Sequence, residues 1–159
     1  MASTIGTAAL TVTLTEAVTL NGSNHGATNT VTFSAINEVS KRIVTITTTE
    51  AVIATFSSAV ASAGHYVAAN VRYIRFTNKD DTNFITLTFR NQDNDEAAIK
   101  LDAGQSFIWN GDNANGMTAV LNATQDADAA SSTNFGSLTN IQADADTASC
   151  DLEMFLASV

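Results

Sequence analysis

The side chains of this sequence that could do chemistry are mostly carboxylates, and their most regular group lies in residues 91–96. Asn91, Asp93 and Asp95 stand at alternate positions, as the first ligands of a calcium-binding loop do. The sixth position of such a loop needs a glycine for its sharp turn, but Glu96 occupies it, and the final bidentate glutamate is missing. We therefore interpret residues 91–96 as a solvated turn between two strands and expect no metal site.

The other candidate metal-binding or catalytic side chains are isolated from one another. His25 and His65 have no neighbouring cysteine and no HxH or HExxH spacing, so they do not form a zinc motif. The GxSxG turn of hydrolases and the GxGxxG and GxxxxGK phosphate loops are absent, and Cys150, the only cysteine, has no catalytic signature around it. Two facing carboxylates from distant loops, as in glycosidases, are the one catalytic arrangement that sequence leaves open. We expect a protein that is not an enzyme and has no cofactor.

Such side chains would be positioned by β-strands, because apolar and polar residues alternate through most of the chain. In residues 71–109, short alternating segments are separated by clusters of Asn, Asp and Gly, which is typical of antiparallel strands joined by tight turns. Residues 139–143 form a marginal strand, and a helix is the competing interpretation of residues 148–158. The expected strands cover residues 10–20, 30–35, 39–48, 51–57, 71–76, 85–90, 97–101, 106–109, 117–121 and 148–158.

About nine or ten short strands, with turn signals roughly every 8 to 12 residues, predict an all-β fold. We expect an antiparallel β-sandwich of jelly-roll-like topology over residues 10–159, preceded by an N-terminal arm at residues 1–9. The high threonine content agrees with a sheet protein. Because proline is absent and lysine is scarce, the strand edges lack their usual protection, so we expect neighbouring subunits to cover them.

The charge balance argues against several classes of partner. The 159 residues include seven Lys and Arg against sixteen Asp and Glu, a formal net charge of −9 that repels nucleic acid and anionic membranes. No apolar run reaches the roughly 20 residues of a membrane-spanning helix. The first residues, MASTIGTAAL, also lack the basic and apolar regions of a signal peptide. We expect synthesis in the cytoplasm and no contact with nucleic acid or membrane.

Side chains in and beside the 71–109 segment are candidates for contact with another subunit. Three of them belong to one strand that has no polar face, as is expected of a central strand or of a strand held by another subunit. Trp109 ends a strand beside the polar loop 110–116, where it is either a core residue or an interface anchor. The candidates are Tyr66, Arg72, Tyr73, Arg75 and Trp109.

Three passages resemble small virion structural proteins of tailed bacteriophages, especially those that infect marine cyanobacteria. They are VSKRIVTITTTEAVIATFSS, VAANVRYIRFTNKDDTNFITLTFRN and AIKLDAGQSFIW. The shared feature, within residues 39–109, is two strands around an N-x-D-x-x-N turn, then a further strand and an L-x-A-G-x-S-F turn. The resemblance implies a β-sandwich decoration or cement protein attached to the outside of a capsid as an oligomer, or a neck or tail component.

We therefore expect a non-enzymatic viral structural protein, most specifically a capsid decoration protein that binds the outer capsid surface and stabilises the shell. Its expected partners are copies of itself, as a dimer or trimer, and the major capsid protein or other virion proteins. Its expected location is the virion, after synthesis in the host cytoplasm. Residues 1–9 and the loop 122–137 are the expected contact arms.

The alternative is a component of the neck, tail or fibre that binds a receptor or glycan. Exposed rings of Tyr66 and Trp109 beside the loop 110–116 would favour this alternative. Burial of the two rings against another subunit would favour the structural role.

Overall fold

The structure, a computed structural model, describes residues 6–111, 113, 116–117 and 137–159. β-strands dominate these residues, and a single-turn 3-10 helix, η1 (Ala68–Asn70), precedes β8. The all-β fold expected from the sequence is confirmed. In chain order the strands are β1 (Ala8–Thr15), β2 (Thr19–Leu20), β3 (Ser23–Asn24), β4 (Thr28–Ile36), β5 (Glu38–Ile46), β6 (Ala51–Ser57), β7 (His65–Val67), β8 (Val71–Asn78), β9 (Ile85–Asn91), β10 (Glu96–Leu101), β11 (Ser106–Asn110), β12 (Leu138–Ala145) and β13 (Cys150–Ser158).

Eight of these strands pair in the nested order of a jelly roll. β5 pairs with β13, β6 with β12, β8 with β11 and β9 with β10, all antiparallel, so the first four strands fold back on the last four. The pairings of β13 with β8 and of β12 with β9 join these pairs into the sheets β11-β8-β13-β5 and β10-β9-β12-β6, the second extended by β7, which runs parallel to β6. Two stacked sheets with this connectivity form a jelly roll. The predicted antiparallel sandwich with jelly-roll-like topology is confirmed.

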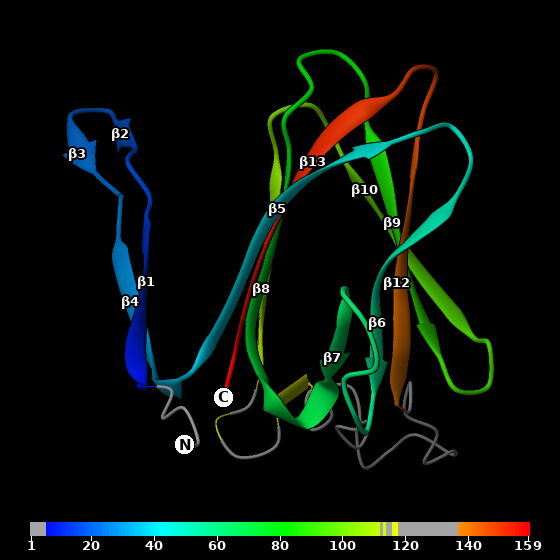
Figure 1. Cartoon of the computed structure of the whole chain (residues 1–159). Helices are drawn as coiled ribbons and strands as arrows, with labels where there is room; N and C mark the ends of the chain where they lie inside the picture. Colours follow the sequence, from blue (N-terminus) through cyan, green and yellow to red (C-terminus); the bar gives the residue numbers. More distant parts are fainter. Residues whose placement is uncertain (1–5, 112, 114–115, 118–136) are drawn as a thin grey trace, which may run out of the picture.

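One main apolar cluster fills the space between the two sheets. Figure 1 shows β5, β13 and β8 facing β6, β12 and β9 across this space. Alternate residues of the central strands point into the cluster, and each fully buried Leu, Ile or Phe contributes roughly 1.5–3 kcal/mol to folding. The fully buried members include Ile74, Phe76, Ile85, Leu87, Ile141, Leu152, Met154 and Leu156.

Strand β8 has no polar face because the chain covers both of its faces. It lies between β11 and β13, so both of its edges are paired, which confirms the expectation of a central strand. Ile74 and Phe76 point into the core. Tyr73 points the other way, into a second apolar cluster with Phe33 and Ile36 of β4.

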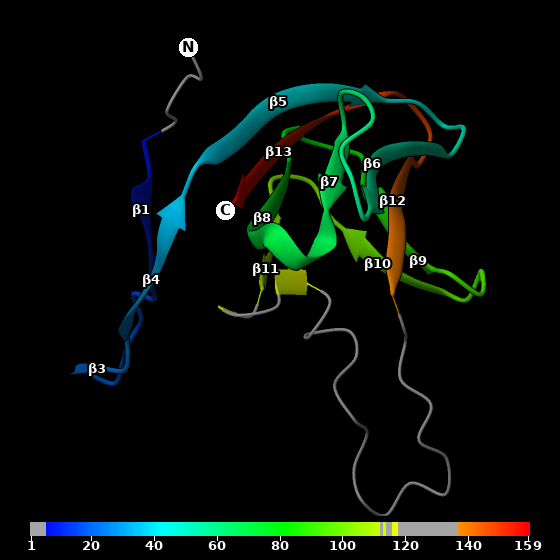
Figure 2. The same cartoon turned by 60° about the horizontal axis from the view of Figure 1, so that its bottom comes forward.

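Residues 8–36 form a hairpin that joins neither sheet of the sandwich. β1 pairs with β4, and β2 pairs with β3 beyond them, through a turn in which Asn21 and Gly22 have the positive φ angles that an Asn-Gly turn requires. Figures 1 and 2 show this hairpin standing beside the sandwich and connected to it through β5. We call residues 8–36 the hairpin arm. The sheets of the sandwich begin at Glu38, so the segment outside them extends well past the residues 1–9 expected as an arm.

The strands near the C-terminus are more central than their sequences indicate. The marginal segment 139–143 is part of β12, which lies between β9 and β6, and residues 150–158 form a strand and not a helix. The expected strand 117–121 and the expected contact loop 122–137 fall almost entirely outside the described residues. No helix in the described ranges has the length and apolar character needed to cross a membrane.

Candidate functional site

The two faces of the hairpin arm differ in chemistry. Leu10, Val12 and Leu14 alternate along β1 with threonines, so the leucines and valine share one face and the threonines share the other. Cross-strand pairs of this kind each stabilise a hairpin by roughly 0.2–1 kcal/mol, so the threonine face helps to hold the arm together. The hydroxyl pairs are Thr11–Thr32 at 3.5 Å, Thr13–Thr30 at 3.3 Å and Thr15–Thr28 at 3.4 Å.

The apolar face of the arm is covered near the base of the arm. Phe33 is only 2% exposed, and its ring centroid lies 6.1 Å from that of Tyr73 on β8. The ring of Phe155 on β13 meets Tyr73 edge-on at 5.9 Å, and Leu10 and Val12 pack partly against the same cluster. These contacts fix the base of the arm to the outer face of the four-stranded sheet, the face that points away from the main core.

Farther along the arm, large apolar side chains are exposed. Leu14 is 53% exposed and Leu20 is 60% exposed, and Val18 and Val31 are exposed as well. Glu16 is the only Asp, Glu, Lys or Arg among residues 6–36. The distal part of the arm is therefore an almost uncharged surface with unburied apolar groups.

The outer face of the four-stranded sheet carries a second exposed apolar surface on its edge strand β5. By strand register, Val39 and Ile43 of β5 lie beside Ala157 and Glu153 of β13, on the same face as Phe155, and Lys41 lies between them on that face. Val39 is 55% exposed and Ile43 is 62% exposed. We call these two side chains the β5 patch. It extends sideways from the surface on which the base of the arm already packs.

The charges between these surfaces are paired with one another. Arg75 of β8 donates a hydrogen bond to Glu153 of β13 with an N–O distance of 2.5 Å, and Lys41 of β5 lies 3.6 Å from the same carboxylate. The hydrogen bond from Arg75 and the two cations hold the pKa of Glu153 below its usual value. Burial raises the pKa of Tyr73, and Arg75 partly opposes that rise. The acidic excess of the chain is thus locally compensated on this face.

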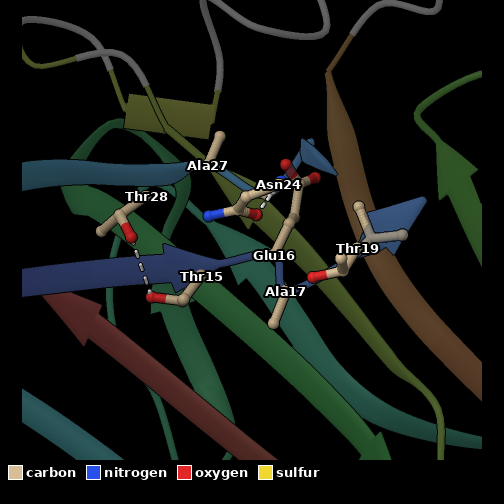
Figure 3. A pocket seen from close by; sticks show the side chains of 9 residues that line it. Thr15, Glu16, Ala17, Thr19, Asn24, Ala27 and Thr28 are labelled. Carbon is tan, nitrogen blue, oxygen red and sulfur yellow. Dashed lines mark hydrogen bonds between the residues drawn. The ribbon is translucent and has the colours of Figure 1, made fainter. Parts of the chain in front are cut away.

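A hollow of about 520 Å³ lies where β1 ends and the β2–β3 hairpin begins (Figure 3). The N–H of Glu16 donates to the carbonyl of Ala27 at 2.8 Å across it, and Asn24 Oδ1 accepts from the N–H of Gly26 at 2.8 Å. A Cβ at position 26 would lie 2.2 Å from the Glu16 carbonyl oxygen, so only glycine fits there. Among the described residues that line the hollow, Glu16 is the one ionisable side chain, so these residues do not include a pair of groups that could act as acid and base.

The acidic turns of the sandwich are closed by their own side chains. Asp80 Oδ1 accepts the N–H groups of Thr82 at 2.8 Å and Asn83 at 2.6 Å, and these bonds lower the pKa of Asp80. Asn91 Oδ1 accepts two N–H groups of its own turn in the same way. In the part of the chain that the structure describes, no three His, Cys, Asp or Glu side chains are grouped so that they could hold a metal ion.

The structure separates the side chains predicted to contact another subunit. Tyr73 and Arg75 lie together on the outer face, beside the hairpin arm. Tyr66 is buried inside the sandwich and donates its hydroxyl to Ser40 Oγ at 3.0 Å. Arg72 is also buried and donates to the carbonyl of Ala69 at 2.7 Å. That Tyr73 and Arg75 contact a second subunit stays a prediction.

Trp109 belongs to the edge of the main core. Its ring packs edge-on against Phe89 with centroids 5.1 Å apart, and it also contacts Phe107. The indole is partly buried against the core cluster. Of the two interpretations left open by the sequence, this packing favours the core residue.

The exposed apolar groups of the arm and of the β5 patch were not predicted from the sequence, which indicates only that residues 10–20, 30–35 and 39–48 form strands. One signal could have located the arm. Both TVTLT at 11–15 and TNTVT at 28–32 place threonine at every second position, so a hairpin turning at Asn21-Gly22 brings threonine opposite threonine.

No protein-family model, curated protein or solved structure matches this chain. The jelly roll, the hairpin arm and the outer face of the four-stranded sheet are therefore the features that bear on its function.

Proposed function

We propose that this protein is a non-enzymatic structural subunit of a virion, most specifically a capsid decoration or cement protein that binds the outer capsid surface and stabilises the shell. The observation that carries the proposal is the hairpin arm, which extends beside the sandwich with its distal apolar side chains in solvent. Its expected partners are further copies of the chain and the major capsid protein.

The arm supports an assembly role for an energetic reason. A two-stranded hairpin is at best marginally stable alone in water. Each Å² of apolar surface left in water costs about 25 cal/mol relative to burial, and contiguous exposed apolar surface marks interaction sites. Packing of Leu14 and Leu20 against another protein would remove this cost and stabilise both the subunit and the assembly.

The fold supports the same class of function by analogy. Jelly rolls form viral capsid domains and lectin domains, among other proteins, so the fold alone does not select one role. The resemblance of residues 39–109 to phage virion proteins favours the viral role over the others.

The placement of the aromatic rings favours a structural subunit over a glycan-binding tip. Sugar recognition by stacking requires exposed aromatic rings, but the Tyr66 ring is buried in the sandwich and Trp109 packs on Phe89. A position in the neck, tail or fibre differs from a decoration role chiefly in copy number.

Quantitative mass spectrometry of purified virions of the phage that encodes the chain tests this proposal. We expect a copy number comparable with that of the major capsid protein. A copy number of only a few per particle would indicate a component of the neck, tail or fibre and would rule out the decoration role. Absence of the chain from purified virions, with the capsid protein detected in the same sample, would overturn the virion role altogether.

A further inference from the structure

We propose that the distal apolar surface of the hairpin arm packs on the β5 patch of a second copy of the chain. The inference deepens the proposed function by naming a partner surface, and it rests on that function only in taking the protein to be an assembly subunit. Leu14 represents the arm side of the contact and Ile43 the β5 side, because both are more than half exposed.

The two surfaces match in chemistry. The base of the arm already packs its apolar face on the outer face of the four-stranded sheet, where Phe33 meets Tyr73. Leu14 continues the same arm face beyond that contact, and Val39 and Ile43 continue the same sheet face to its edge. The proposed contact therefore repeats, between two copies, a type of packing that exists within one copy.

The two surfaces are places where the charge of the chain opposes a second copy least. Two molecules that each carry a net charge of −9 repel over most of their surfaces. The arm holds one carboxylate, and on the outer face Lys41 and Arg75 compensate Glu153. These are surfaces on which two copies can meet with little repulsion.

The arm of one copy does not lie over its own β5 patch. Phe33 holds the base of the arm at Tyr73, and Figures 1 and 2 show β2 and β3 at the end of the arm that points away from the sandwich. Within the described part of the chain, both surfaces are thus left exposed. A contact between two different surfaces of identical chains gives a reciprocal dimer, a ring or, where the rotation does not close, an open filament.

Molar-mass measurements by light scattering on the full-length protein test the contact with two disruptive variants. Leu14→Asp places a charge on the arm, and Ile43→Asp places one on the β5 patch. We expect each to raise the dissociation constant of the oligomer at least about tenfold, since a charge buried in an apolar contact is costly. Ser58→Asp adds the same charge in the exposed loop after β6, a strand of the other sheet, so we expect it to associate as the unaltered protein does. All three positions are exposed or on the arm, and circular dichroism checks that the fold is retained.

A mixing experiment identifies the pair of surfaces. In a mixture of Leu14→Asp with Ile43→Asp, the intact arm of the second variant can occupy the intact β5 patch of the first. We expect dimers in the mixture that neither variant forms alone. If Leu14→Asp dissociates the oligomer but Ile43→Asp does not, or if mixing restores nothing, the arm contacts another surface and the inference is wrong.

Failure of this inference can be told apart from failure of the proposed function. An unaltered protein that stays monomeric at all concentrations would overturn the contact between copies. The abundance of the chain in virions would still decide the decoration role, because a monomer can bind a capsid directly.

Discussion

The carboxylate of Glu153 connects three strands of the outer face through its contacts with Arg75 and Lys41. Its pKa is lower in the folded protein than in the unfolded chain, chiefly because Arg75 donates a hydrogen bond to it. Near this pKa the folded state therefore binds fewer protons than the unfolded state. The stabilisation that Glu153 contributes through these contacts is fully present above the ordinary pKa of 4.5, and it is lost as the pH falls through the lowered pKa of the folded state.

Glu153→Gln should consequently make the free energy of unfolding less dependent on pH below about pH 5, since the titrating group is gone. Urea unfolding at a series of pH values between about 2 and 7 measures this dependence. Glu16→Gln is the control, because it removes a carboxylate that lies on the arm and not on the outer face. The ion-pair assignment would be contradicted if the free energy of unfolding of Glu153→Gln fell with decreasing pH as steeply as that of the unaltered protein.

Asn78 shows that the N-x-D-x-x-N motif has a structural function. The side chain is fully buried, and its Nδ2 donates to the carbonyl oxygens of Asn83 at 2.8 Å and Leu101 at 3.1 Å. Its Oδ1 accepts the N–H of Asp80 at 3.0 Å. One amide thus joins two neighbouring turns of the sandwich.

Asn78→Ala would leave buried carbonyl oxygens without donors, so we expect a loss of about 1–3 kcal/mol of stability. Chemical denaturation measures the loss, and Asn37→Ala at an exposed position should change stability by less than about 0.5 kcal/mol. Equal effects of the two substitutions would show that the amide network contributes little.

At the scale of elements, alternation predicted the strands of the sandwich well, because one face of each strand packs on a single core. The spacing of the turns suggested a jelly roll, and the nested pairing of the strands from β5 to β13 has that topology. The hairpin arm was missed because alternation identifies an apolar face but not the surface that the face contacts. Leu14 and Val31 have the pattern of core residues and lie in solvent.

The burial of Tyr66 and Arg72, two of the five predicted interface side chains, was equally beyond the sequence. Tyr66 lies on the short strand β7 and Arg72 at the start of β8, and the burial of both side chains depends on which elements neighbour these strands in space. Only the fold reveals that Tyr66 reaches Ser40 and that Arg72 reaches Ala69. Tyr73 and Arg75 point to the outer face because they alternate along β8 with Ile74 and Phe76, which point into the core.

Phe33→Ala should release the arm without unfolding the sandwich, because Phe33 packs in the small second cluster and not in the main core. Hydrogen exchange followed by mass spectrometry should show faster exchange in residues 8–36 and unchanged protection of β8 and β13. Thr32→Ala, on the threonine face beside it, should leave the arm docked. Equal loss of protection in the arm and in the sandwich would mean that the two fold as one cooperative unit.

At the scale of the whole molecule, the net charge of −9 opposes every contact between copies. Association through apolar surfaces should therefore strengthen when salt screens this repulsion. Sedimentation equilibrium at about 0.05 M and about 0.5 M NaCl measures the change, and we expect a lower dissociation constant at high salt. Weaker association at high salt would indicate a contact made by ion pairs and not by the arm.

Contact between the arm of one copy and β5 of another is tested most directly by chemical cross-linking of single-cysteine substitutions. Leu14→Cys protein is mixed with Ile43→Cys protein and treated with a short bismaleimide, while the native Cys150 stays buried in the core. We predict a cross-linked dimer in this mixture and none when Ser58→Cys, in the exposed loop after β6, replaces Leu14→Cys. A mixture that associates but cross-links only Leu14→Cys chains to each other would contradict the account, because the arms would then pair with arms.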